Sequence, residues 1–504
     1  MSNKYLQRHG VAAQLALLIG PLFALSIYLL LPVNYTDVEG VVFELSNPAR
    51  ITAAIAVLMA VWWMTEAIPV YATALLPLAL FPLFGISGIH STAAAYGNEI
   101  IYLFLGGFIV ALALERWGLH RRLALNVLAA VGPQPRAIIG AFMAVSAILS
   151  MWVTNTATTI MLLPVAVSVI KLLPGNDLQD GHADAPFSVC LLLGIAYAAS
   201  IGGMGTIIGT APNMFVVSFI KENLQREIGF VEWMMFALPL VIVFVPVAWV
   251  VLTRWVFPVS NKALPGAVEL LQKERDHLQA FSRGEVLTLC VFVLTAAAWI
   301  TRPLLNRFEI GGLYPLEGLS DPGIAVLAAL VLFVTPVSLQ RREFLMDWST
   351  AVRLPWGLLI LFGGGLALAA ALVETGFSHY FGNLATVLDA LPVWMIVLIT
   401  TAAVVFLTEL TSNTATTATI VPILLAVALG LGLPPLLLIL PAAFAASSAF
   451  MLPVATPPNA IVFGSNLLHV GQMSRAGIWL NIVAIGLITG ATYIIIIPAL
   501  GINL

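Results

Sequence analysis

Charged residues are scarce in this chain, and their scarcity excludes a soluble protein. Only 9% of the 504 residues are charged and 61% are hydrophobic, too few polar groups to cover a water-facing surface. The composition therefore indicates a polytopic membrane protein surrounded by lipid, and no nucleic-acid partner is expected. Cys190 and Cys290 stand alone in apolar runs, so neither a disulfide nor a metal site is implied.

Charge is absent above all from three long segments. Residues 137–170 and 187–220 contain no charged side chain, and 400–468 contains one, the acidic Glu409. An anion bound there would meet no Arg or Lys, and burying a dianion against neutral dipoles alone is costly. Bound sodium ions would supply the missing positive charge and would couple the two fluxes, so the absence favours sodium symport.

A polar cluster occurs twice in the same register. Thr-Asn-Thr-Ala-Thr-Thr at 154–159 returns as Ser-Asn-Thr-Ala-Thr-Thr at 412–417, 258 positions later. The pairs Gly106 and Gly364, Gly118 and Gly376, and Pro164 and Pro422 keep that spacing, while Gly209-Thr-Ala-Pro-Asn213 returns as Ala455-Thr-Pro-Pro-Asn459 after 246. Matching polar clusters in both halves predict one binding site built from two copies of a fold.

The apolar runs predict an all-α membrane protein with about eleven transmembrane helices and two re-entrant hairpins. The first run, Val11–Leu31, lacks a small-residue cleavage signal, so a retained helix is expected rather than a signal peptide. Each hairpin holds one Asn-Thr cluster near its middle. The predicted crossings are 11–32, 51–69, 71–88, 100–115, 187–220, 234–256, 285–303, 322–338, 356–372, 436–468 and 478–500, and the hairpins are 137–172 and 393–432.

The distribution of basic residues orients the chain. With the N-terminus in the cytoplasm and the C-terminus outside, 16 of the 21 Lys and Arg residues fall in cytoplasmic segments. Treating either hairpin as a full crossing would reverse every later loop and remove this bias. The outer side keeps Arg50, Lys221, Arg226, Arg302 and Arg307.

Four regions follow from this topology. Residues 1–50 form an N-terminal helix and outer loop, 51–256 the first repeat, 257–284 a charged cytoplasmic linker, and 285–504 the second repeat. Each repeat has five crossings, an odd number, so the second copy enters the membrane inverted. The first hairpin is then expected to open to the cytoplasm and the second to the outside.

The polar clusters can serve two ligands. Asn, Ser and Thr oxygens and the carbonyls freed by Gly and Pro breaks suit sodium, whereas amide nitrogens, hydroxyls and helix N-termini suit carboxylate or sulfate oxygens. Thr-rich runs are also common packing contacts between membrane helices, but duplication in register favours a binding site. Gly106-Gly107 and Gly363–Gly365 indicate close helix contacts. Glu409 has two open interpretations, a proton site or a hydrogen-bonded structural acid.

These residues resemble the divalent anion/sodium symporter family, the sodium-coupled di- and tricarboxylate transporters of the INDY type. The resemblance rests on the two Asn-Thr clusters, the two Pro-Asn breaks, and the long signature that runs here from Ala446-Ser447 through Phe450, Pro453-Val454-Ala455, Asn459 and Val462. Thr154 and Ala211 depart from the family's usual Ser and Pro without removing a type of ligand. The resemblance covers most of 51–500.

The resemblance also implies site residues. One sodium site would use Ser150, Thr154, Asn155 and the carbonyl of Gly209; the other would use Thr408, Thr411, Asn413 and the carbonyl of Ala455. Substrate carboxylates would meet Asn155, Thr156 and Thr210 on one side, and Ser412, Asn413, Thr414 and Thr456 on the other. The family further implies a homodimer in which a substrate-bearing domain moves against a scaffold, the elevator mechanism.

The sequence thus predicts a sodium-coupled importer of a divalent anion in a bacterial inner membrane, with a C4-dicarboxylate such as succinate, malate or fumarate as its substrate. The alternatives are a sodium-coupled sulfate or citrate carrier and a sodium-independent dicarboxylate exchanger. An enzyme would need a nucleophile–base pair or metal ligands in the core, and all seven histidines fall in predicted loops or span ends. A channel is disfavoured because two closed hairpin tips do not make an open pore.

Overall fold

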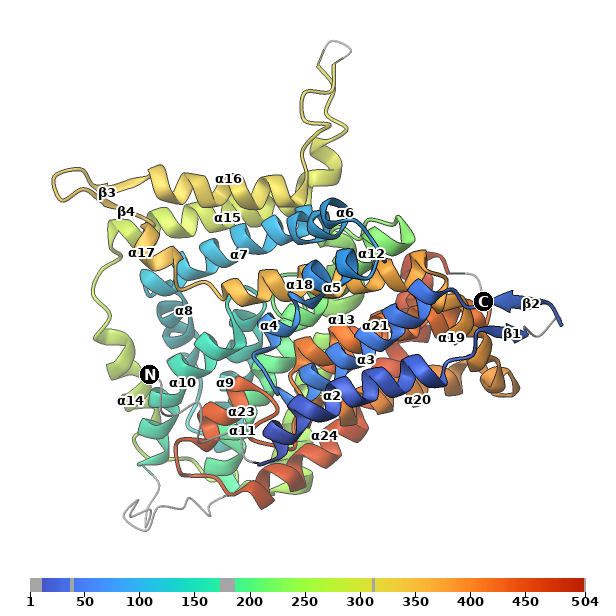
Figure 1. Cartoon of the computed structure of the whole chain (residues 1–504). Helices are drawn as coiled ribbons and strands as arrows, with labels where there is room; N and C mark the ends of the chain where they lie inside the picture. Colours follow the sequence, from blue (N-terminus) through green and yellow to red (C-terminus); the bar gives the residue numbers. More distant parts are fainter. Residues whose placement is uncertain (1–10, 37–39, 173–185, 311–312, 503–504) are drawn as a thin grey trace.

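The computed structural model describes residues 11–36, 40–172, 186–310 and 313–502, and it is almost entirely helical (Figure 1). Its strands form two small antiparallel pairs. These are β1 (Asn34–Thr36) with β2 (Val42–Glu44), and β3 (Pro336–Ser338) with β4 (Glu343–Phe344). The all-α polytopic class expected from composition is confirmed.

The first half of the chain runs from a lipid-exposed helix to the long helix before the linker. Its helices are α2 (Val11–Leu30), α3 (Asn47–Thr65), α4 (Val70–Thr73), α5 (Leu76–Leu83), α6 (Ile89–Ala94), α7 (Glu99–Arg116), α8 (Leu119–Leu128), α9 (Pro135–Ser150), α10 (Asn155–Ile170), α11 (Pro186–Gly203), α12 (Ala211–Leu224) and α13 (Phe230–Val250). A 3-10 turn (Ala95–Gly97) precedes α7, and a π-helical turn (Val251–Val256) extends α13.

The second half repeats this order of elements after the linker helix. Its helices are α14 (Ala267–Asp276), α15 (Arg283–Leu305), α16 (Asp321–Val334), α17 (Trp348–Ala351), α18 (Trp356–Glu374), α19 (Phe377–Ala385), α20 (Val393–Thr408), α21 (Asn413–Gly430), α22 (Leu436–Ala446), α23 (Pro457–Phe463), α24 (Val470–Ala491) and α25 (Ile497–Leu500). A 3-10 turn (Thr386–Ala390) precedes α20, and a π-helical turn (Thr492–Ile496) joins α24 to α25.

Within the described ranges, eight helices are long and apolar enough to cross a membrane, or nine if the bent pair 377–390 and 393–408 is one span. The two predicted hairpins coincide with the helix pairs α9–α10 and α20–α21. At about 1.5 Å per residue, the three arms of 16 residues are each about 24 Å long, less than a hydrocarbon core of about 30 Å. The 18-residue arm α21 is about 27 Å long and is one of the eight helices long enough to cross. The total of eleven crossings and the re-entrant path remain predictions.

Close packing between the halves uses the repeated glycines. A Cβ on Gly106 of α7 would collide with the backbone of Ala325 in α16, and a Cβ on Gly364 of α18 would collide with the carbonyl of Ala74 after α4. Helix α7 of the first half therefore packs against α16 of the second half, and α18 of the second half packs against the segment between α4 and α5 of the first half. The close contacts expected from the Gly106 and Gly363–Gly365 positions are present.

The repeat extends to short helices that the sequence analysis did not separate. Gly118 has φ +67° and begins α8, while Gly376 has φ +80° and begins α19. Both glycines adopt the left-handed conformation that other residues rarely take, which accounts for their equal spacing in the sequence. His120, expected in a loop or span end, is the second residue of α8 and is buried.

The ends of the long helices separate two groups of loops. In Figure 1, α14 and the β3–β4 pair lie at the left end of the molecule, whereas β1–β2 and α19 lie at the right end. The left-hand elements carry Lys273, Arg275, Arg341 and Arg342, which the charge bias assigns to the cytoplasm. This arrangement is compatible with the predicted orientation, which stays a prediction.

Accessibility labelling tests the orientation of the two helix pairs. A cysteine at Gln134, the residue before α9, should react only with a membrane-impermeant reagent on the cytoplasmic side, and one at Leu391, before α20, only from outside. The reason is that an inverted repeat makes the pairs open to opposite faces. Labelling of both from one face would contradict the inverted arrangement.

Candidate functional site

The first polar tip lies where α9 ends and α10 begins. Thr154 caps α10, its hydroxyl accepting from the backbone N–H of Ala157 at 3.3 Å. The hydroxyl of Ser150 donates to Oδ1 of Asn155 across the turn at 2.5 Å. Three of the residues assigned to the first sodium site therefore meet within one turn of chain.

The second tip repeats this arrangement between α20 and α21. The hydroxyl of Thr408 lies 2.8 Å from Oδ1 of Asn413 and 2.9 Å from the carbonyl of Ala446, as a donor to either oxygen. Thr408 and Asn413 follow Ser150 and Asn155 by 258 positions, the spacing seen in the sequence. The repeat therefore conserves a hydrogen bond as well as residue types.

The two breaks, α11–α12 and α22–α23, are each held by one buried asparagine. Nδ2 of Asn213 lies 3.0 Å from the carbonyl of Gly203 and 2.8 Å from that of Thr206. Nδ2 of Asn459 lies 3.2 Å from the carbonyl of Ala449 and 3.1 Å from that of Leu452. Each of these three residues lies 246 positions after its counterpart in the first break. These amides satisfy carbonyls that the unwound helices expose, so the breaks are built features of both halves.

Gly203 brings the first tip and the first break together. A Cβ built on Gly203 would lie 2.7 Å from Oδ1 of Asn155 and 3.2 Å from the carbonyl oxygen of Gly209. Two oxygens assigned to the first sodium site therefore face one small space that only a glycine leaves open. The tip is also tied to the break through the hydroxyl of Thr206, which donates to the carbonyl of Met151 at 2.5 Å.

The remaining predicted residues lie at the starts of helices. Thr210 precedes α12 and Thr456 precedes α23, where its hydroxyl accepts from the N–H of Asn459 at 3.3 Å. Thr156 and Thr414 are the second residues of α10 and α21. Ser412 is the residue before α21, and its side chain makes no capping bond. Helix N-termini carry partial positive charge, which suits an anion where no basic side chain is available.

Two of the predicted sodium ligands are engaged differently. The hydroxyl of Thr411 lies 2.5 Å from that of Thr416 and 3.0 Å from the carbonyl of Leu407, so it bonds within its own segment. Ala455, whose carbonyl was assigned to the second site, forms a turn with Leu452 that matches the turn of Gly209 with Thr206. Thr411 therefore departs from the arrangement seen in the first site, whereas Ala455 repeats that of Gly209.

Glu409 has four hydrogen-bond donors around its carboxylate. The backbone N–H groups of Phe450, Met451 and Leu452 donate at 2.6 to 3.2 Å, and Nδ2 of Asn481 on α24 donates at 2.8 Å. Glu409 is 3% exposed and has no ion-pair partner in the described part of the chain. This geometry favours the structural interpretation, because both carboxyl oxygens accept from backbone N–H groups and so order the second break.

Comparison with known proteins identifies the family of this chain. The family described as the sodium:sulfate symporter transmembrane region matches residues 13–500. The chain belongs to the divalent anion/sodium symporter family. It is therefore a multi-pass membrane transporter and not an enzyme, and the sodium coupling inferred from its charge-free site agrees with the family's description.

Relatives and one solved structure agree with this family. The sodium-dependent dicarboxylate transporter of Staphylococcus saprophyticus is 39% identical over 508 residues, covering 100% of this chain and 95% of the relative. That of Staphylococcus aureus is 39% identical over 457 residues, covering 90% and 86%. The crystal structure of the YdaH transporter of Alcanivorax borkumensis shares the fold at 13% identity, with a TM-score of 0.63 over 97% of this chain and 99% of that one.

Gly203 offers a direct test of the first sodium site. Gly203→Ala should raise the sodium concentration for half-maximal uptake by about fivefold to a hundredfold, since overpacking costs about 1–3 kcal/mol. Uptake is measured against sodium concentration in proteoliposomes. The control is Gly486→Ala on α24, where a Cβ meets nothing within 4 Å. An unchanged sodium dependence in Gly203→Ala would remove Asn155 and Gly209 from the site.

Glu409→Gln separates the two interpretations of the buried acid. The amide replaces one acceptor by a donor facing backbone N–H groups, which costs about 1–3 kcal/mol, so the melting temperature should fall with the shape of the pH–uptake profile unchanged. The exposed Glu374→Gln is the control. A stable variant whose uptake no longer varies with pH would make Glu409 a proton site instead.

Proposed function

We propose that this chain is a sodium-coupled symporter that imports C4-dicarboxylates such as succinate, malate and fumarate across a bacterial inner membrane. The chain matches two relatives over most of their length, and both are named sodium-dependent dicarboxylate transporters, which supports the substrate class. The proposal includes the orientation, with the N-terminus in the cytoplasm, and a homodimer that moves its substrate-bearing part against a scaffold.

One observation carries the proposal: the matched orientation of Asn155 and Asn413. In each tip Oδ1 accepts from a hydroxyl, and Nδ2 has no hydrogen-bond partner among the described residues. The oxygen side is therefore turned toward the predicted sodium ligands, and the amide N–H groups remain available for a carboxylate. An ion and an anion can share each asparagine without an intervening basic residue.

The substrate side of the proposal uses the helix starts. Thr156 and Thr210 would bind one carboxylate with Asn155, and Ser412, Thr414 and Thr456 would bind the other with Asn413. Thr414 and Thr456 are buried, whereas Thr156 and Thr210 are partly exposed. Two carboxylate sites of this kind fit a dianion with a carboxylate at each end.

The alternatives differ in a measurable way. Radiolabelled succinate uptake into proteoliposomes should require an inward sodium gradient and should be reduced by malate and fumarate. Stronger inhibition of uptake by sulfate or citrate would identify that anion, and not a C4-dicarboxylate, as the substrate. Uptake that needs internal dicarboxylate but no sodium would make the protein an exchanger.

Asn413 tests the shared ligand within that assay. Asn413→Asp keeps an oxygen for sodium and for the Thr408 hydroxyl but places a negative charge where the substrate carboxylate binds, in a poorly screened site. Uptake should be abolished while sodium still protects a cysteine near the tip from labelling. Asn413→Ala should weaken both sodium protection and uptake, because it removes the common ligand.

The matched control is Asn126→Asp on α8, an exposed asparagine to which the structure gives no hydrogen bond. It introduces the same charge away from the site and should transport like the parent. Normal sodium dependence in Asn413→Ala would refute the shared-ligand mechanism.

A further inference from the structure

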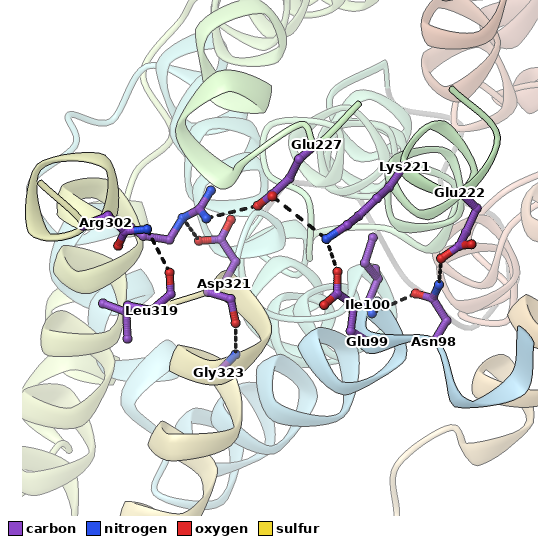
Figure 2. A network of polar contacts seen from close by, with 12 residues as sticks. Asn98, Glu99, Ile100, Lys221, Glu222, Glu227, Arg302, Leu319, Asp321 and Gly323 are labelled. Carbon is purple, nitrogen blue, oxygen red and sulfur yellow. Dashed lines mark hydrogen bonds and ion pairs between the residues drawn. The ribbon is translucent and has the colours of Figure 1, made fainter. Parts of the chain in front are cut away.

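A network of charged and amide side chains lies away from the two tips, at the face predicted to be outer (Figure 2). We name it the outer network. It consists of Asn98, Glu99, Lys221, Glu222, Glu227, Arg302 and Asp321, and several of these residues line a cavity of about 230 Å³. None of them belongs to the candidate transport site.

The outer network joins two groups of helices. Lys221, Glu222 and Glu227 lie on α12 and the segment that follows it, whereas Asn98 and Glu99 begin α7. Lys221 pairs with Glu99, and Nδ2 of Asn98 donates to Glu222. Ser218, one turn earlier on α12, also donates to Asn98 at 3.4 Å. Most of the polar residues near the end of α12 therefore reach across to α7.

A second set of contacts reaches α15 and α16. Nη1 of Arg302 on α15 lies 3.0 Å from Oε1 of Glu227, and its Nε lies 2.8 Å from Oδ1 of Asp321. Oδ2 of Asp321 accepts from the backbone N–H of Phe230, the first residue of α13, at 3.0 Å. Asp321 is only 4% exposed, so this acid fixes the start of α13 against the start of α16.

Helix α12 connects the outer network to the candidate site. Thr210, assigned to substrate, precedes its first turn, and Lys221 lies in its last turn. The 14 residues between Ala211 and Leu224 form a helix about 21 Å long that packs against α21 and α22. A displacement of the site that carries α12 along must therefore pull Lys221 and Glu222 away from α7.

We propose that the outer network is a latch that holds α12 and the start of α13 against α7, α15 and α16 and opens once in every transport cycle. This proposal rests on the proposed transport function, since a secondary transporter exposes its site alternately by moving one bundle against another. Contacts made in only one arrangement lower the free energy of that arrangement, so its population rises and that of the other falls.

The strength of the latch suits reversible opening. The side chains of Lys221, Glu99 and Glu227 are 32%, 49% and 49% exposed, so water replaces their partners readily when the pairs separate. An exposed ion pair of this kind changes an equilibrium by about 1.4-fold to fivefold. These two pairs therefore bias the transporter only weakly toward the closed outer face, and the buried hydrogen bond between Asp321 and the N–H of Phe230 must open with them.

Thiol labelling of the full-length protein measures the latch. The reporter is Val217→Cys on α12, which lines the cavity and is 3% exposed, in a background with Cys190→Ala and Cys290→Ala. Without sodium or substrate, a membrane-impermeant maleimide on the predicted outer side should react about 1.4 to 5 times faster in Glu99→Gln or Glu227→Gln. Because the effects of separate pairs multiply, the double variant should react about 2 to 25 times faster. Choline chloride should accelerate labelling in the parent and have little effect on the double variant.

The matched control is Glu232→Gln. Glu232 pairs with Arg226 at 3.1 Å, and both lie in the same stretch of chain around the start of α13. It removes the same charge from the same region without breaking a bridge between helix groups, so the labelling rate should equal that of the parent.

An unchanged rate in the double variant would overturn the latch, as would an equal increase in Glu232→Gln. If the double variant is unstable by size-exclusion chromatography, the labelling rates of the single variants and of the parent at increasing salt test the latch instead. Labelling needs no transport, so a parent that fails to take up succinate but shows these labelling changes would refute the proposed substrate and leave the latch standing.

Discussion

The need to satisfy backbone groups inside a membrane governs this structure. Two helices are broken at membrane depth, and each break frees carbonyls and amides that water cannot reach. Asn213 and Asn459 supply two N–H groups each to these carbonyls, and Glu409 accepts from three successive amides. These side chains hold the broken backbone beside the oxygens that are proposed to bind sodium.

The two halves of the chain satisfy the backbone groups at their breaks with different hydrogen-bonding partners. In the second half a carboxylate gathers the N–H groups of 450–452, whereas at the corresponding place in the first half the carbonyl of Met151 accepts from the hydroxyl of Thr206. A buried acid demands more compensation than a carbonyl, and Asn481 of α24 contributes the additional donor. The duplication is therefore close in geometry and unequal in charge.

The sequence predicted what depends on pattern and composition. Membrane-spanning character, the location of both tips and the glycine contacts followed from hydropathy and spacing, whereas the family followed from the resemblance of the motifs to known ones. The position of Gly203 beside Asn155 was not predicted, because the sequence does not show which glycine faces that side chain. The bond of Asn481 to Glu409 was not predicted, because the two residues lie 72 positions apart. The outer network was missed for the same reason, since the side-chain pairs that bridge its helix groups join residues 75 to 124 positions apart. Helices α8 and α19 were merged into loops because their amphipathic stretches are too short to resemble spans.

The bond between Ser150 and Asn155 has a consequence for the proposed transport cycle. The serine hydroxyl donates to Oδ1, the same oxygen that is proposed to bind sodium, so this oxygen has a hydrogen-bond partner without the ion. Thr408 and Asn413 repeat the arrangement. A symporter must return without cargo after each delivery, and a buried oxygen without a partner would resist that step. In the proposed cycle, the two hydroxyls would therefore keep both asparagine oxygens hydrogen-bonded while no sodium is bound.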